Sequence, residues 1–221
     1  MIPIDEERTG SLEARLASAL AASDDSTRLR AALAIGADPI PSLVETLVAR
    51  CAIEPDFFVR DMLTWALTRF PPELTVPRLL DELRSDCAQA RSQALHTLSK
   101  IKDPRTWPAI TRSLLCDPDD EVARSAWRAA VVLVPKGQEK DLAETLAGQL
   151  GRGNREVQLS LSRALVALGE DAIAPVLDRA IASDDPLVRA HARATERLLR
   201  DPDAGFELAI AEAKRITILG V

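Results

Sequence analysis

Apolar residues recur along the chain with the spacing of a helix face. After an acidic or Asn turn, a lead residue is followed by small or apolar residues four, seven, eight and eleven positions later. These offsets lie on one face of an α-helix and do not fit a strand. Successive lead positions are 31 to 35 residues apart, and they are Thr27, Val59, Ala90, Val122, Val157 and Val188. The pattern therefore predicts six copies of one helical unit, with helices starting at residues 25, 57, 88, 120, 155 and 186.

A second amphipathic helix is predicted between successive copies, at residues 41–51, 75–85, 106–116, 141–150 and 174–183. A further helix at 11–22 precedes the first copy, and a capping helix at about 203–216 follows the last. This gives about thirteen helices joined by short turns, as arrays of helix pairs require. No linker or shift in composition divides the chain, so we expect a single repeat domain over 1–221, with a short acidic N-terminal tail at 1–10.

The helix starts carry capping residues. Three residues before the lead position, a side-chain oxygen can accept a hydrogen bond from the exposed N–H groups of the first turn. The residues in this column are Asp24, Asp56, Asp119, Asn154 and Asp185. Cys87 takes the same place in the third copy, where we expect a weaker cap.

The recurring pattern D-x-x-V-R-x-x-A-x-x-A-L resembles the HEAT repeat, especially the short bacterial HEAT-like repeats of the phycobilin-lyase type, from about Ser11 to Ile216. The resemblance implies an all-α fold, a right-handed α-solenoid (α-α superhelix) of about six helix pairs, with the V-R helix on the concave side. It also implies a hydrogen-bonded ladder between neighbouring repeats, formed by Asp24, Asp56, Asp119, Asp185, Arg28, Arg60, Arg91 and Arg189. Ala123 and Gln158 replace the Arg in two copies, so we expect the ladder to be interrupted there.

Composition narrows the classes of function. Ala, Leu, Arg and Glu dominate, and these residues favour helix. The net charge of −6 argues against a general nucleic-acid binder. We expect Cys51, Cys87 and Cys116 to be small buried side chains in a reducing compartment. With two His residues, no clustered Cys and no phosphate loop or nucleophile motif, the sequence predicts no metal, no cofactor and no enzymatic activity. It also has no apolar stretch long enough for a membrane span and no signal-peptide pattern, so we expect a cytoplasmic protein.

The columns two and six positions after each lead residue fall off the apolar face, so we expect them to line the groove. An aromatic cluster lies on the second inner helix, and three arginines occupy these columns further along the chain. We predict a partner-binding groove formed by Phe57, Phe58, Asp61, Met62, Trp65, Ser92, His96, Arg124, Arg128 and Arg163. It suits a protein segment with an apolar anchor and acidic groups, because Arg recognises carboxylate and phosphate well. We expect His191, Trp107 and Trp127 to pack in the interior.

Two other functions stay open. HEAT-like alkylpurine DNA glycosylases use Trp, Asp and Arg in the concave groove, and Asp61, Trp65 and Arg128 supply those residue types here, without a matching motif. The lyase-type relatives suggest an accessory factor for cofactor attachment. The sequence specifies neither the partner nor the oligomeric state.

Overall fold

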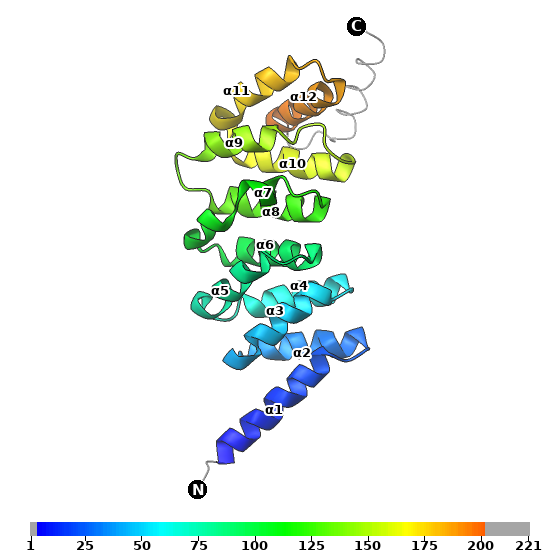
Figure 1. Cartoon of the computed structure of the whole chain (residues 1–221), viewed down its shortest axis with the longest axis vertical. Helices are drawn as coiled ribbons and strands as arrows, with labels where there is room; N and C mark the ends of the chain where they lie inside the picture. Colours follow the sequence, from blue (N-terminus) through cyan, green and yellow to red (C-terminus); the bar gives the residue numbers. More distant parts are fainter. Residues whose placement is uncertain (1–3, 202–221) are drawn as a thin grey trace. The chain divides into compact units, whose positions relative to one another are not determined.

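The computed structural model describes the backbone of residues 4–201 and the side chains of residues 12–201. This part of the chain is helical and contains no strand, which confirms the all-α class (Figure 1). The six helices that begin with the repeated pattern, termed the inner helices, are α2 (Asp25–Ala37), α4 (Phe57–Leu67), α6 (Ala88–Ile101), α8 (Asp120–Leu133), α10 (Arg155–Ala167) and α12 (Pro186–Arg200). All six begin at the residue that the pattern predicts.

The remaining helices alternate with the inner ones along the chain. These outer helices are α3 (Val44–Ile53), α5 (Pro72–Glu82), α7 (Arg112–Leu115), α9 (Glu139–Ala147) and α11 (Glu170–Ile181). Helix α1 (Ile4–Leu20) precedes the first inner helix, and two 3-10 helices span Pro41–Leu43 and Pro104–Ala109.

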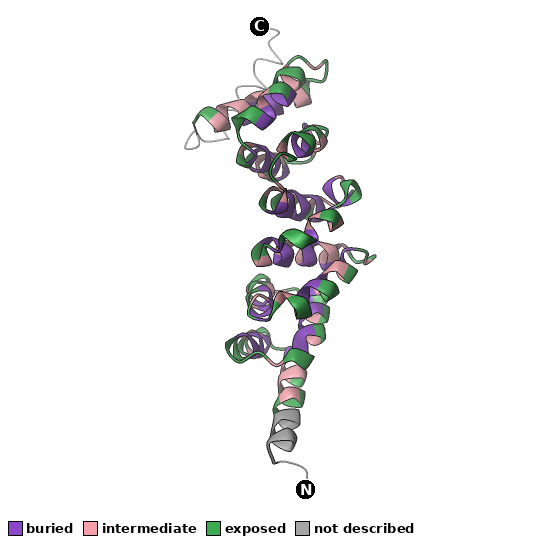
Figure 2. Ribbon diagram, turned by 90° about the vertical axis from the view of Figure 1, so that its left-hand side faces the viewer, coloured by how far each residue is buried: buried purple, intermediate pink, exposed green. Residues whose placement is uncertain are grey.

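The chain forms two compact units, Met1–Ala109 and Ile110–Val221, called unit 1 and unit 2 below. In unit 1, α2 packs on α4 and α4 on α6, while α3 packs on α5. In unit 2, α8, α10 and α12 pack in the same succession, and α9 packs on both α7 and α11. Within each unit, Figure 2 shows the buried residues gathered where inner and outer helices face each other. The helix pairs thus stack by the same two-layer rule in both units; the assignment of the whole chain to one domain stays a prediction.

Side-chain caps define the starts of five inner helices. The side chains of Asp24, Asp56, Asp119, Asn154 and Asp185 each accept a hydrogen bond from a backbone N–H of the first turn. Cys87 stands in the same column before α6 and makes no side-chain cap. Both predictions are confirmed, and each cap contributes about 1 kcal/mol to helix stability.

Arginines that follow the lead residues hold the turns that enter the inner helices. Each donates from Nη1 to the carbonyl oxygens five and six residues earlier, at 2.7–3.2 Å, and these residues are Arg28, Arg60, Arg91 and Arg189. The accepting carbonyls lie at or just beyond the end of the preceding helix, where helical N–H groups do not reach them. These bonds join each arginine to the turn before its own helix, and the ladder between neighbouring repeats stays a prediction.

One buried carboxylate does connect neighbouring repeats in unit 1. Glu54 is fully buried and accepts hydrogen bonds from Nε and Nη2 of Arg28 at 2.7 and 2.8 Å. It also accepts from Nε of Arg50 at 2.8 Å and from the backbone N–H of Asp56 at 2.9 Å. Burial alone would raise the pKa of Glu54, but the bonds from Arg28 and Arg50 outweigh it and hold the pKa at about 2. The link between these repeats therefore uses a glutamate that the repeat pattern does not mark.

The interruption expected at Ala123 and Gln158 is filled by other side chains. Arg152, in the turn before α10, donates from Nη2 to the carbonyls of Asp117 at 2.6 Å and Pro118 at 3.1 Å. These carbonyls are six and five residues before Ala123, which are the positions that an Arg at 123 would hold. Gln158 donates from Nε2 to the carbonyl of Gly153 at 3.3 Å, five residues earlier. Both acceptors before Ala123 are therefore bound by another side chain, whereas Gln158 itself binds one of the two before its own position.

Several other expectations need adjustment. Helix α1 begins at Ile4, inside the range assigned to a tail. The helix predicted over 106–116 is replaced by the 3-10 helix containing Pro108 and the single turn of α7, since proline lacks the N–H that an α-helix needs. Trp107 is accordingly only half-buried. Trp127 is fully buried and donates from Nε1 to the carbonyl of Leu115 at 2.8 Å, as expected of a core position.

Of the three cysteines, Cys51 is buried, Cys116 is half-buried and Cys87 is exposed, so the expectation of burial is confirmed only for Cys51. Burial raises the pKa of the Cys51 thiol to about 12. The predicted capping helix at about 203–216 lies outside the described residues.

Candidate functional site

The columns predicted to face the groove are only partly exposed. In unit 1, Asp61 and Trp65 are exposed, Met62 and His96 are half-buried, and Ser92 is buried. The placement of Ser92 on an accessible surface is therefore wrong: its side chain is too short to project past its neighbours. Ala190 and Ala194 in the last copy are buried for the same reason. Long side chains in these columns reach solvent and short ones do not.

Unit 1 carries an exposed aromatic patch, formed by Phe57, Phe58 and Trp65 of α4. The two phenylalanines are 65% and 71% exposed, and their rings meet edge to face at 5.6 Å. The guanidinium of Arg60 lies 6.0 Å from the centre of the Phe57 ring, within cation–π range. Phe70 lies beyond the end of α4 and is buried, so it does not belong to this patch. Large exposed aromatic side chains are costly to leave in water, and they are typical anchors of interfaces.

Trp65 is held in place by a glycine of the neighbouring inner helix. A Cβ atom at Gly36 of α2 would lie 2.2 Å from Cζ3 and 2.7 Å from Cε3 of the Trp65 ring. The indole therefore packs directly on the backbone of α2 and still leaves 37% of the residue exposed. Leu33, one turn before Gly36, is 40% exposed, so an apolar surface continues along α2. The glycine is the feature that sequence inspection missed, although a Gly within a helix often marks such a close approach.

In unit 2, the three predicted arginines line one pocket. The pocket lies between two neighbouring inner helices and has a volume of about 350 Å³. Its walls include Arg124, Arg128 and Val131 of α8 and Glu156, Leu159 and Arg163 of α10. The pocket brings together all three arginines that the sequence pattern predicted for the groove, beside the apolar side chains of Val131 and Leu159.

The charges in this pocket, called the arginine pocket below, are unevenly paired. Arg124 binds Glu121 at 2.6 Å and lies 3.9 Å from Glu156. Arg128 donates from Nη2 to the hydroxyl of Ser125 at 3.1 Å, and neither it nor Arg163 has a carboxylate within 4 Å among the described residues. Sequence reasoning left open whether each arginine pairs with an acid; one does, and two do not.

Two further observations concern the donors of this pocket. Nε of Arg124 is buried and has no hydrogen-bond partner among the described residues. Burial lowers the pKa of Arg128, the positive charge of Arg124 lowers it further, and Glu121 offsets part of this effect. Arg128 and Arg163 both reach solvent, so their guanidinium groups are accessible to an anion in the pocket.

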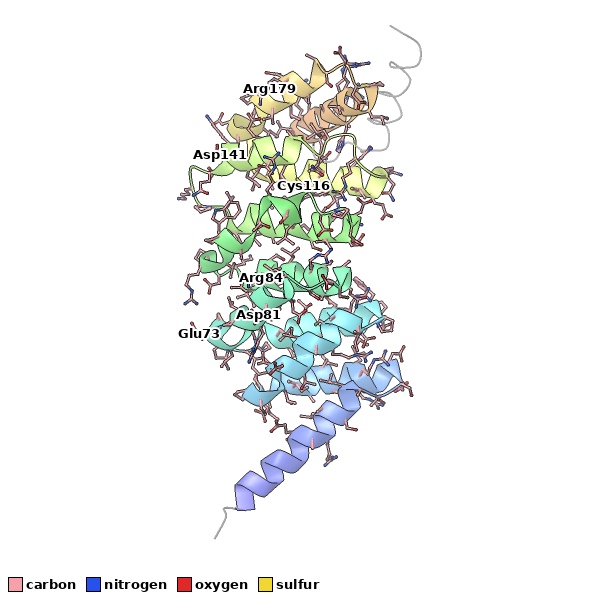
Figure 3. All side chains as sticks on the ribbon, in the orientation of Figure 1. Glu73, Asp81, Arg84, Cys116, Asp141 and Arg179 are labelled. Atoms are coloured by element: carbon pink, nitrogen blue, oxygen red, sulfur yellow. The ribbon has the colours of Figure 1, made fainter. Side chains whose placement is uncertain are left out.

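The opposite, outer-helix side of unit 2 has ordinary ion pairs instead. Arg179 of α11 pairs with Glu144 of α9, both well exposed. Figure 3 shows Arg179 and Asp141 on this outer-helix surface.

A serine and a histidine lie together in unit 2, but they form an interior network. Nδ1 of His191 accepts from the backbone N–H of Gly151 at 3.0 Å, so Nε2 carries the proton. Nε2 lies 2.9 Å from the carbonyl of Gln158 and 3.0 Å from the Ser162 hydroxyl, which also contacts Thr195. Burial lowers the pKa of His191 to about 4. Ser162 and His191 are both buried, so the pair fits packing between repeats, as expected for His191, and not nucleophilic catalysis.

Searches for other kinds of site give little. No group of three or more His, Cys, Asp or Glu side chains within residues 12–201 could hold a metal ion. No helix of the described part is long and apolar enough to cross a membrane. The residues considered for a DNA-repair site are divided between the units, with Asp61 and Trp65 in unit 1 and Arg128 in unit 2.

Comparison with known proteins agrees with the repeat pattern. Residues 54–131 match the family model described as HEAT repeats. No curated protein matches the chain. HEAT repeats generally form protein-interaction scaffolds, and the family is typically non-enzymatic.

Proposed function

Since this chain is a HEAT-repeat protein, we propose that it is a non-enzymatic interaction scaffold whose inner helices bind an acidic or amphipathic segment of a partner protein. The arginine pocket is the observation that carries this proposal. Two of its guanidinium groups have no carboxylate partner in the described chain, and a third has a buried Nε without an acceptor. Acidic side chains supply both the negative charge and the acceptor oxygens that this surface lacks.

The aromatic patch of unit 1 supports an amphipathic rather than a purely acidic partner. Phe57, Phe58 and Trp65 expose rigid apolar surface, and Trp65 is fixed by its contact with Gly36. Aromatic side chains that are already ordered lose little entropy on binding, so they make effective anchors.

Selection from a library of displayed random peptides tests this function. The full chain is expected to enrich peptides with Asp or Glu, and Arg163→Glu should abolish their binding. Arg112→Glu is the matched control, because Arg112 is exposed on outer helix α7 and does not line the pocket. Selected peptides without acidic enrichment, or equal losses in the two variants, would count against the proposal.

A second pair of variants tests the aromatic anchor. Trp65→Ala should weaken the selected peptides that contain apolar residues, whereas Leu74→Ala should not. Leu74 is a suitable control because its exposed fraction, 39%, is similar to the 37% of Trp65. It lies on outer helix α5 instead of an inner helix. Circular dichroism of each variant checks that helicity is retained. If Trp65→Ala and Leu74→Ala bind every peptide equally, the aromatic patch is not a contact surface.

A further inference from the structure

The arginine pocket has a specific charge deficit. Three guanidinium groups line it, and both nearby carboxylates interact with the same one, Arg124, at 2.6 Å from Glu121 and 3.9 Å from Glu156. Arg128 and Arg163 have no ion-pair partner within residues 12–201. Two positive charges are therefore left without close compensation, on two different helices.

The two uncompensated arginines are placed alike in consecutive repeats. Arg128 of α8 and Arg163 of α10 each stand six residues after their lead residue, and α8 packs on α10. Inner helices at this spacing are roughly 8–10 Å apart, so both guanidinium groups can reach one small anion. The Ser125 hydroxyl, 3.1 Å from Nη2 of Arg128, helps to hold that side chain in the pocket.

These observations fit a dianion better than a carboxylate. A carboxylate group carries one negative charge and two acceptor oxygens, so it would leave one arginine uncompensated. A phosphate monoester carries a charge close to −2 at neutral pH and three acceptor oxygens. We propose that the arginine pocket binds a phosphate monoester on a serine or threonine side chain of the partner segment. This inference rests on the proposed function, since it names the group by which that segment is recognised.

The pocket walls suit a phosphorylated side chain of a protein rather than a nucleic acid. Val131 and Leu159 give apolar contacts for the carbon atoms that carry the phosphate. A phosphodiester backbone has one charge per phosphate and is bound by many cations along a track. The arginine pocket of about 350 Å³ is instead a single small concavity, in a chain with a net charge of −6.

Binding of short peptides to the full chain tests the inference. The probe is acetyl-Gly-Ala-phosphoserine-Ala-Gly-amide, and its counterparts carry Glu or unmodified Ser at the central position. The observable is the set of arginine Nε–H cross-peaks in ¹H–¹⁵N spectra, followed during titration. We expect the phosphoserine peptide to bind at least ~10-fold more tightly than the Glu peptide. Arg128→Gln and Arg163→Gln should each remove that preference, while Arg112→Gln keeps it.

Acidity of the ligand supplies an independent check. The second pKa of a phosphate monoester is about 6, so lowering the pH from 7.5 to 5 should weaken the phosphoserine peptide by up to ~10-fold. The Glu peptide should be weakened far less, because its side chain has an ordinary pKa of about 4.3. Arginines stay charged throughout this range, so the difference reports the charge of the ligand.

The remaining outcomes each have a fixed meaning. If the Glu peptide binds as tightly as the phosphoserine peptide, and equally at both pH values, the phosphate inference is overturned while the acidic-segment function stands. Binding of neither peptide, together with a library free of acidic enrichment, would reject both. Inorganic phosphate binding as tightly as the phosphopeptide would contradict a partner segment, and tighter binding of an oligothymidylate without terminal phosphates would point to nucleic acid.

Discussion

Arg152 provides a direct test of how the repeat frame is held together. Its Nη2 donates to the carbonyls of Asp117 and Pro118, which an arginine at position 123 would otherwise hold. Its Nε also binds Oδ1 of Asp120 at 2.9 Å. In Arg152→Ala, both carbonyls lose their donor, and the carbonyl of the buried residue Asp117 is the more costly to leave unsatisfied.

The expected loss follows from these contacts. Hydrogen bonds with one charged partner contribute about 1.5–3 kcal/mol each, and less where water reaches them. The Asp120 ion pair is largely exposed on the carboxylate side and adds at most about 1 kcal/mol. Arg152→Ala should therefore cost about 2–3 kcal/mol of unfolding free energy. Urea denaturation of the full chain gives the total, and hydrogen exchange of peptides covering residues 117–130 locates the loss in the turn before α8.

The decisive measurement adds Ala123→Arg, which restores the arginine of the repeat pattern. In the Arg152→Ala background this change should recover at least half of the lost free energy, because it refills the same acceptors. In the wild-type background it should destabilise, since two guanidinium groups then compete for one turn. Arg112→Ala, an exposed arginine of the same unit, should change stability by less than about 0.5 kcal/mol. If Arg152→Ala changes the unfolding free energy as little as that control, Arg152 does not hold the turn. If Ala123→Arg changes the unfolding free energy in the same direction in both backgrounds, Arg152 does not take the place of an arginine at position 123.

Three other predictions concern single positions. Gly36→Ala places a Cβ inside the Trp65 ring, so it should cost about 1–3 kcal/mol and shift the indole N–H cross-peak of Trp65; Gly148→Ala, with its nearest neighbour at 3.4 Å, should do neither. The pKa of Glu54 is lowered from 4.5 to about 2, so the stability that its carboxylate contributes is complete above pH 4.5 and is lost as the pH falls toward 2. In urea denaturation across that pH range, Glu54→Gln should remove this dependence of the unfolding free energy on pH. The pKa of His191 is lowered from 6.5 to about 4, so between these pH values the unfolded chain binds a proton that the folded protein excludes. The free energy of unfolding should therefore fall as the pH drops from 6.5 to 4. If His191→Gln shows the same fall in unfolding free energy over this pH range, this account is contradicted.

The inner helices could be predicted to the residue because their signals are local. A capping oxygen at Asp56 or Asp119 and a valine three positions later act within one turn, so they need no knowledge of the rest of the chain. The outer helices were less predictable where local signals conflict. Around Pro108 an apolar spacing suitable for a helix is combined with a proline, and the backbone adopts a 3-10 helix there.

Contacts between repeats were missed because they involve residues outside the repeated pattern. Glu54 ends up between Arg28 and Arg50 only when two helix pairs stack, and Arg152 reaches carbonyls 34 and 35 residues away. Comparison of the repeats shows that the usual arginine is replaced by alanine at position 123. It does not show which neighbouring side chain makes the hydrogen bonds in its place. Such replacements depend on the distance between turns in adjacent repeats, which is a property of the packed structure.

For the candidate site too, the positions of the side chains could be predicted from the sequence, but their ion pairs could not. The column six residues after the lead selects Arg128 and Arg163 because its direction from the helix axis is fixed by helix geometry. Whether those arginines are neutralised depends on where each carboxylate turns, and Glu121 and Glu156 both turn toward Arg124. One arginine thus takes the acidic neighbours of the pocket, and the other two keep their charge for an anion from outside. For that reason Glu156→Gln should leave binding of the phosphoserine peptide nearly unchanged, whereas a simple count of charges, in which Glu156 competes with the ligand, predicts tighter binding.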